Sequence, residues 1–127
     1  MVQNFFYIKG VENEEELRER LEVKKKVHGK YINSQDRFHR NIKRRIVMKQ
    51  HNMPTKAFVL EELEIDDPKD IKDHIPEYKM SGNVELRFGY YIISPKAGRW
   101  LWGQYCPFIP PEDFEMVLEK AKEHGFI

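Results

Sequence analysis

Two runs of aromatic and β-branched residues, 84–93 and 99–106, lie near the end of the chain, separated by Ser94-Pro95-Lys96-Ala97-Gly98. Strand-forming runs on either side of a loop that contains Pro and Gly predict a β-hairpin over about residues 84–106. A four-residue loop with Gly98 at positive φ places Ser94 opposite Arg99. The expected pairs are then Ile93 with Trp100, Ile92 with Leu101, and Tyr91 with Trp102.

The middle of this hairpin is apolar on both faces. Side chains alternate between the two faces of a strand, so a hairpin at a protein surface normally has one polar face. In the expected register, Tyr91 and Trp100 lie on one face, and Tyr90 and Ile92 lie on the other. We therefore expect both faces to be covered, one by the last helix and the other by a second helix or by an external partner.

Residues 111–124 have the pattern of an amphipathic helix. Pro111 suits the first helical position, acidic residues follow it, and basic residues occupy the last turn, which matches the helix dipole. Gly125 is placed to end the helix in the left-handed conformation, with Phe126 folding back onto it. The apolar stripe is expected to pack on the preceding hairpin, and it consists of Phe114, Val117, Leu118 and Ala121.

The N-terminal part of the chain predicts a strand followed by a helix. The segment Val2–Lys9 is rich in strand-forming residues, and Gly10 follows it. Asn13 with Glu16 three residues later resembles a capping box. A helix is therefore expected from about Glu14 to about His28.

The segment after Tyr31 fits two structures. Phe38, Ile42 and Ile46 recur at a helical spacing, whereas the alternation from Ile42 to Met48 is typical of a strand. For residues 38–49 we expect a short helix to about Asn41 and then a strand from about 43 to 49. Residues 57–65 predict a strand antiparallel to it, residues 67–75 a short helix, and residues 81–83 a turn.

These elements predict a single α+β domain over residues 1–127. Its sheet is expected to be mainly antiparallel, with the hairpin of about 84–106 at the centre and helices packed on it. A chain of 127 residues with 13% aromatic residues can bury a substantial core. Charged residues make up 34% of the chain, but the net charge is only +1, which argues against disorder.

The cysteine content and the hydropathy bear on the compartment. The one cysteine, Cys106, excludes an internal disulfide, and its place at the end of an apolar run predicts a small buried side chain. The first residues lack the apolar region of a signal peptide. No segment approaches the roughly 18 apolar residues that span a bilayer. We expect a cytoplasmic protein without a membrane partner.

Positive charge is concentrated in one segment. Residues 24–49 contain ten basic side chains against one acid, Asp36, a net charge of +9. Such a block attracts either a polyanion or the acidic residues 61–77 of the same chain. If this segment is a helix, the spacing of Arg37, Arg40 and Arg44 places them on one face of it. If it is a strand, Arg40 and Arg44 still share one face. The predicted DNA- or RNA-binding residues are Lys24, Lys25, Lys26, Lys30, Arg37, Arg40, Lys43, Arg44, Arg45 and Lys49.

The aromatic residues of the hairpin suggest a second surface. Tyr91, Trp100 and Trp102 share one face and are expected either to belong to the core or to form a stacking or homodimer surface. The motif-like residues 100–114 indicate no activity that we can assign.

Candidate catalytic chemistry is sparse. The five histidines do not have the close spacing of a zinc site, and there is no phosphate-binding loop or serine elbow. We therefore predict no catalytic residue, metal or cofactor, and a non-enzymatic binding domain. The alternatives are a protein-interaction or homodimerisation module and, third, a metal-dependent hydrolase or nuclease that uses acids between Asp66 and Glu77 with Lys79.

Overall fold

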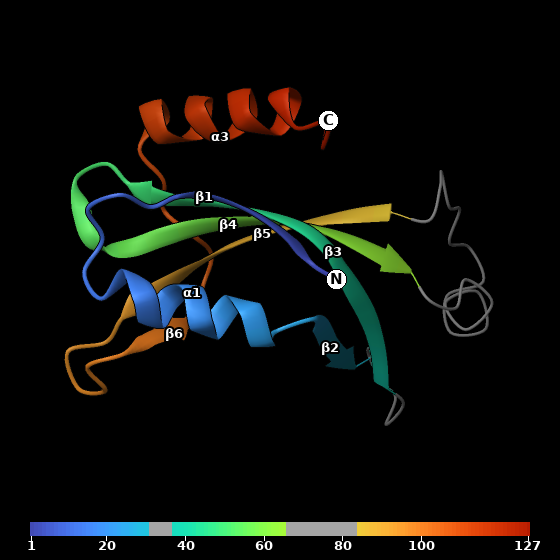
Figure 1. Ribbon diagram of the computed structural model, residues 1–127, viewed down its shortest axis with the longest axis horizontal. Helices are drawn as coiled ribbons and strands as arrows, with labels where there is room; N and C mark the ends of the chain where they lie inside the picture. Colours follow the sequence, from blue (N-terminus) through green and yellow to red (C-terminus); the bar gives the residue numbers. More distant parts are fainter. Residues whose placement is uncertain (31–36, 66–83) are drawn as a thin grey trace.

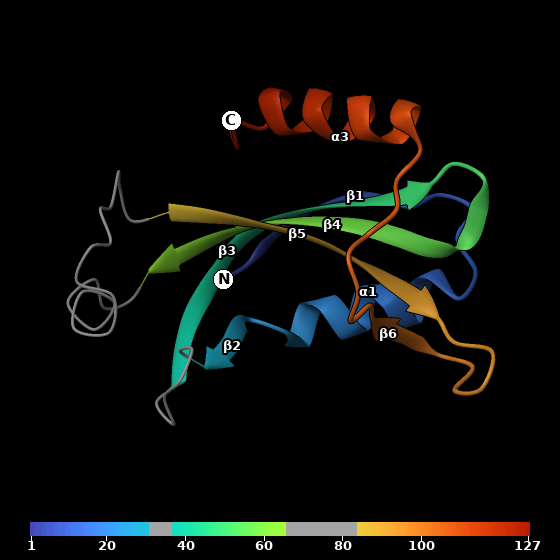
Figure 2. The same cartoon turned by 180° about the vertical axis from the view of Figure 1, so that it is seen from behind.

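The computed structural model describes residues 1–30, 37–65 and 84–127 (Figure 1). Within them the elements are β1 (Gln3–Tyr7), α1 (Glu14–Val23), β2 (Lys26–Lys30), β3 (Arg37–Gln50), β4 (Met53–Ile65), β5 (Val84–Ile93), β6 (Trp100–Trp102) and α3 (Pro111–Glu123). The six strands form one sheet, and the two helices lie on opposite faces of it (Figures 1 and 2). The predicted α+β fold with helices packed on the sheet is confirmed.

The centre of the sheet is the long hairpin of β3 and β4. The strand order is β1-β3-β4-β5-β6, and β2 also pairs with β3. Only the β1–β3 pair is parallel, whereas every other described pair is antiparallel. The hairpin of about 84–106 therefore lies at an edge, and its predicted central position is wrong. The long β3–β4 pairing is stabilised by cross-strand ion pairs that the apolar pattern did not predict.

The register of the β5–β6 hairpin agrees with the sequence prediction. Tyr91 pairs with Trp102, Ile92 with Leu101 and Ile93 with Trp100. Gly98 has a φ of 64° and donates its backbone N–H to the Ser94 carbonyl over 2.8 Å. The second strand ends earlier than predicted, at Trp102, after which the chain runs past β5 to the α3 side of the sheet (Figure 2).

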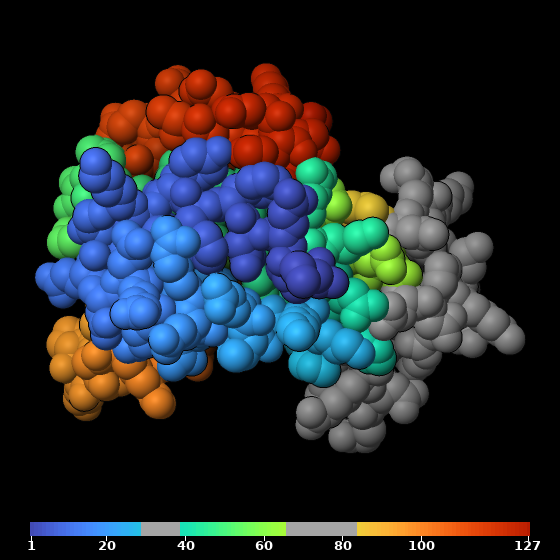
Figure 3. Space-filling view, in the orientation of Figure 1, coloured from blue at the N-terminus to red at the C-terminus, as the bar shows by residue number. Residues whose placement is uncertain are grey.

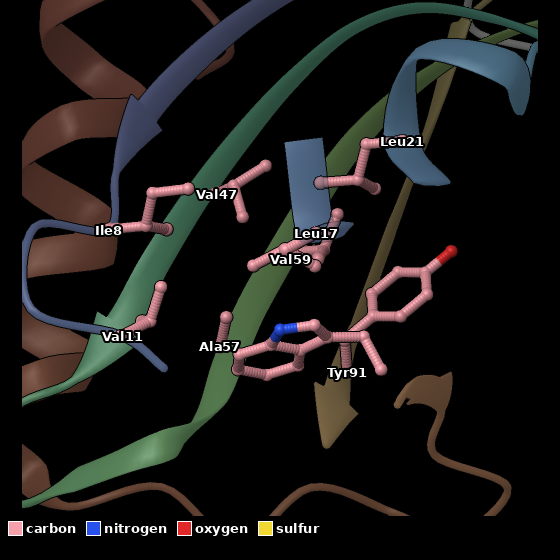
Figure 4. Close-up of a cluster of buried hydrophobic side chains, with 9 residues drawn as sticks. Ile8, Val11, Leu17, Leu21, Val47, Ala57, Val59 and Tyr91 are labelled. Atoms are coloured by element: carbon pink, nitrogen blue, oxygen red, sulfur yellow. The ribbon is translucent and has the colours of Figure 1, made fainter. Parts of the chain in front are cut away.

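The two described helices lie on opposite faces of the sheet, whereas the apolar pattern predicted that they would cover the two faces of the hairpin at about 84–106. On the α1 face, residues of α1 pack against β3, β4, β5 and β6 (Figure 4). This cluster comprises Ile8, Val11, Leu17, Leu21, Val47, Ala57, Val59, Tyr91 and Trp100. On the α3 face, the buried cluster is Ile46, Met48, Leu60, Val117, Ala121 and Phe126.

The last helix packs differently from the prediction. Its buried cluster comes mainly from β1, β3 and β4, and the β5–β6 hairpin contributes Phe88 to it (Figure 1). Phe114 and Leu118 of the predicted stripe are exposed, and the buried side is Asp113, Val117 and Ala121. The predicted end is confirmed, because Gly125 has a φ of 76° and the Phe126 N–H bonds to the Ala121 carbonyl over 2.7 Å.

Two predictions in the first half of the chain were wrong. The helix α1 ends at Val23 rather than near His28, because Val27 is buried on β2 against Ile42 and Leu63. Residues 37–41 belong to strand β3 rather than to a helix, because β2 pairs with all five of them and β4 pairs with Arg40 and Asn41. The predicted helix at 67–75 and turn at 81–83 lie outside the described residues.

Candidate functional site

Among the side chains that the structure describes, four of the predicted basic residues form ion pairs with acids of β4 and β5. Arg40 Nε lies 3.1 Å from Glu85 Oε1, and Lys43 Nζ lies 3.0 Å from Glu64 Oε2. Arg44 Nη2 lies 2.6 Å from Glu62 Oε2, and Arg45 Nε lies 3.2 Å from Glu61 Oε2. These pairs place much of the positive charge of β3 against negative charge within the fold.

The pair of Arg45 and Glu61 is the most deeply buried of the four, with side chains that are 0% and 1% exposed. Arg45 also donates to Asn4 Oδ1 over 3.0 Å and to the backbone carbonyl of Lys24. Glu61 accepts a second guanidinium, because Arg87 Nη2 lies 2.6 Å from Glu61 Oε1. These three charged side chains pair with one another as part of the fold, because a buried charge requires a partner of opposite sign.

A β-bulge separates two arginines that were predicted to share a face. The β3–β4 register shifts between Ile42 and Arg44. An extra residue in one strand reverses the side on which the following side chains lie. Arg40 therefore approaches Glu85 on the α1 face, whereas Arg44 donates to the His124 carbonyl on the α3 face over 2.6 Å. The predicted common face of Arg40 and Arg44 is wrong.

Three exposed lysines of the predicted segment lie at the connection between α1 and β2. Lys24, Lys25 and Lys26 are exposed, and with Val23 and His28 they line a surface hollow of about 450 Å³. We call these three residues the lysine patch. No ion pair joins any of them to another described residue. Figure 3 shows this light-blue segment on the outer surface of the molecule. Lys49 is half-buried, and the side chains of Lys30 and Arg37 lie outside what the structure describes.

The predicted aromatic surface lies mostly inside the molecule. Tyr91 is buried in the cluster on the α1 face (Figure 4), Trp100 is fully buried in the same cluster, and Trp102 is partly buried against it. The Trp100 indole N–H reaches the Glu12 carbonyl over 3.1 Å, which fixes the ring. Burial raises the pKa of the Tyr91 hydroxyl above its ordinary value. Tyr91 and Trp100 are therefore covered by their own chain and do not face a partner.

A pocket that the sequence reasoning missed lies on the opposite face of β5. It has a volume of about 500 Å³, and we call it the Lys56 pocket. The strands β4 and β5 form its floor, and the segment between β6 and α3 forms its rim. Its lining residues are Met53, Lys56, Tyr90, Ile92, Tyr105, Cys106 and Phe108.

Lys56 is the buried charge of this pocket. Its side chain is 9% exposed, and Nζ donates to the Phe108 carbonyl over 2.8 Å. The same atom lies 5.0 Å and 5.1 Å from the ring centroids of Phe58 and Tyr90. Burial lowers the pKa of Lys56 below its ordinary value, and the charge of Asp113 partly opposes that shift. Within the described residues, no carboxylate forms an ion pair with Lys56.

The rim of the pocket consists of exposed residues, and one of them was predicted to be buried. Cys106 is exposed, so its predicted burial was wrong, because β6 ends before it. Tyr105 and Phe108 are 83% and 86% exposed. Two features of the sequence could have indicated the Lys56 pocket, namely a lysine beside the apolar run 57–60 and the motif-like residues 100–114. Neither feature indicates that these two segments lie next to each other in the fold.

A histidine–carboxylate pair lies at the same end of the sheet. His51 Nδ1 is 2.8 Å from Asp113 Oδ2, and the His51 backbone N–H also points to that carboxylate. The hydrogen bond to Asp113 raises the pKa of His51 above its ordinary value, and the charge of Glu112 adds to the effect. The pair joins the β3–β4 turn to the first turn of α3.

Comparison with family models, with curated proteins and with solved structures found no match to this chain. In the residues that the structure describes, no three His, Cys, Asp or Glu side chains are placed to hold a metal ion together. None of the described helices is long and apolar enough to cross a membrane.

Proposed function

We propose that the protein is a non-enzymatic nucleic-acid-binding domain whose contact surface is the lysine patch. The observation that carries the proposal is the run of three exposed lysines that border one hollow and form no ion pair with a described residue. Exposed lysines can neutralise phosphates without first breaking an internal contact. The paired residues Arg40, Lys43, Arg44 and Arg45 belong to the fold rather than to this surface.

Two histidines support the choice of ligand. His28 lines the hollow, and its ring centroid lies 6.2 Å from that of His39 on the adjacent strand. Both residues are exposed. Aromatic rings next to lysines offer stacking surfaces for unpaired bases, so single-stranded DNA or RNA suits this surface better than a duplex.

The test is a salt titration of binding to a single-stranded oligonucleotide. The wild-type protein is compared with a variant in which Lys24, Lys25 and Lys26 are all changed to Ala. The slope of log affinity against log salt should become shallower by about 0.7 for each phosphate contact that is lost. The discrimination between oligonucleotide sequences should change little, because phosphate contacts do not read bases.

A charge-matched control separates the patch from net charge. Changing the exposed lysines Lys9, Lys96 and Lys122 to Ala removes the same charge from three other places. This control should keep most of the affinity. An equal loss in both triple variants would refute the lysine patch, and a wild-type protein that retains no DNA or RNA at low salt would refute the function.

A further inference from the structure

We propose that the Lys56 pocket binds a small, flat aromatic carboxylate, with the carboxylate at Lys56 Nζ and the ring against the apolar walls. This site lies on the α3 face of the sheet and does not include the lysine patch. The proposal therefore adds a ligand to the molecule and is independent of nucleic-acid binding.

The charge at the base of the pocket determines the polar group of the ligand. An ammonium group has three donors, and the Phe108 carbonyl accepts one of them at 2.8 Å. The rings of Phe58 and Tyr90 stabilise the cation partly but supply no negative charge. A buried cation without an ion-pair partner favours an anion that enters its pocket. A carboxylate has acceptor oxygens for the two remaining donors.

The walls determine the body of the ligand. Apart from Lys56, the lining is aromatic, aliphatic or sulfur-containing. A volume of about 500 Å³ lies within the range of pockets that hold small organic molecules. Tyr105 and Phe108 stand at the rim with more than four-fifths of their surface in solvent. A flat aromatic ligand would cover part of this exposed apolar surface, which favours binding.

The ring of Tyr90, which lines the pocket, packs closely on the backbone at Gly103. A Cβ atom on Gly103 would lie 2.1 Å from the Tyr90 ring, so glycine lets that ring lie directly on the neighbouring chain. The Gly103 N–H also donates to the Tyr90 carbonyl over 2.8 Å. Tyr90 is thus held in place before any ligand arrives, which lowers the entropy cost of binding.

The pocket contains a reporter of its own occupancy. Cys106 lines it and is the one cysteine in the sequence. A ligand that fills the pocket should shield this thiol and slow its alkylation by iodoacetamide. The alkylation rate therefore locates the binding, while an affinity measurement shows which chemical group matters.

The experiment uses two probes that differ only in charge, 2-naphthoate and 2-naphthamide. We expect the wild-type protein to bind the carboxylate about tenfold more tightly than the amide, a difference of about 1.4 kcal/mol. The variant Lys56→Met should lose that preference while it keeps its affinity for the amide. The matched variant Lys96→Met, at an exposed turn, should behave as the wild type does. Saturating 2-naphthoate should slow the alkylation of Cys106 in the wild type.

A second variant keeps the test decisive if Lys56→Met does not fold. Cys106→Trp places a large side chain at the exposed rim and should abolish the binding of both probes. The proposal is overturned if 2-naphthoate does not bind the wild type at about 1 mM. It is also overturned if both probes bind equally, or if bound 2-naphthoate leaves the alkylation rate of Cys106 unchanged.

Discussion

Two buried cations on opposite faces of the sheet show two ways in which a fold accommodates charge. Arg45 on the α1 face is held by Glu61, Asn4 and a backbone carbonyl, and its side chain has no exposed surface. Lys56 on the α3 face donates to one carbonyl and has aromatic rings nearby, but it pairs with no described carboxylate. Both side chains are inside, but of the two only Arg45 forms an ion pair with a described carboxylate.

The difference separates a structural charge from an available one. A guanidinium whose N–H groups already bind a carboxylate and other acceptors has few hydrogen-bond donors left for a ligand. An ammonium group with spare donors at the base of an open pocket can still gain an interaction from outside. The Arg45 site on the α1 face is therefore part of the core, and the pocket beside β5 on the α3 face is where we propose that a ligand binds.

The largest effect is expected at Glu61. Changing Glu61 to Gln removes the carboxylate that lies between Arg45 and Arg87, and leaves the fully buried Arg45 beside the partly exposed Arg87 without that charge. The free energy of unfolding should fall by about 3–5 kcal/mol, the range for a broken buried pair. Urea denaturation measures this change.

The control for Glu61 is Glu64→Gln. Glu64 pairs with Lys43 at 3.0 Å, but both side chains are about half exposed. Its loss should cost about 0.5 kcal/mol, as for other surface pairs. If the two variants lost similar amounts of stability, the distinction between a buried structural pair and a surface pair would fail.

A smaller effect, of opposite sign, is expected at Lys56. Changing Lys56 to Met replaces a buried cation by an apolar chain of similar length, at the loss of one hydrogen bond. Because the cation is desolvated and forms no ion pair with a described carboxylate, the free energy of unfolding should rise by about 1 kcal/mol in the absence of ligand. Urea denaturation of the ligand-free variant measures it. A loss of stability would mean that Lys56 is as well satisfied as Arg45.

The smallest effect concerns pH and the pair of His51 and Asp113. The pKa of His51 is higher in the folded state than in the unfolded state, so protonated His51 stabilises the fold. This stabilisation is complete below the unfolded-state pKa of about 6.5 and disappears as the pH rises through the folded-state pKa. The melting temperature of the wild type should therefore decrease relative to that of His51→Gln as the pH rises from 5 to 8. Parallel curves for the two proteins would show that His51 does not couple to folding.

The sequence predicted those features of the fold that depend on residues close together in the chain. The register of the β5–β6 hairpin followed from the loop between Ser94 and Arg99, and the end of α3 followed from Gly125. Both are decided by turn geometry within a few residues. The strand at 57–65 was also expected to lie antiparallel to 43–49, and it does.

Features that depend on distant segments were not predictable in the same way. The bulge after Ile42 changes which basic side chains meet Glu61 and Glu62, and no spacing rule in the sequence fixes it. The Lys56 pocket combines β4, β5 and the segment after β6, so it exists only once the sheet is assembled. The lysine patch was part of the predicted basic segment. Only the strand register shows that its lysines differ from the basic residues of β3, which form ion pairs with acids of β4 and β5.

The placement of the two tryptophans has a practical consequence for spectroscopy. Trp100 and Trp102 both pack into the cluster on the α1 face, and Arg87 lies 4.3 Å above the Trp102 ring. The described part of α3 contains no tryptophan. Indole emission therefore reports the docking of α1, while a separate release of α3 would go largely unseen in a fluorescence trace and would require amide exchange to detect.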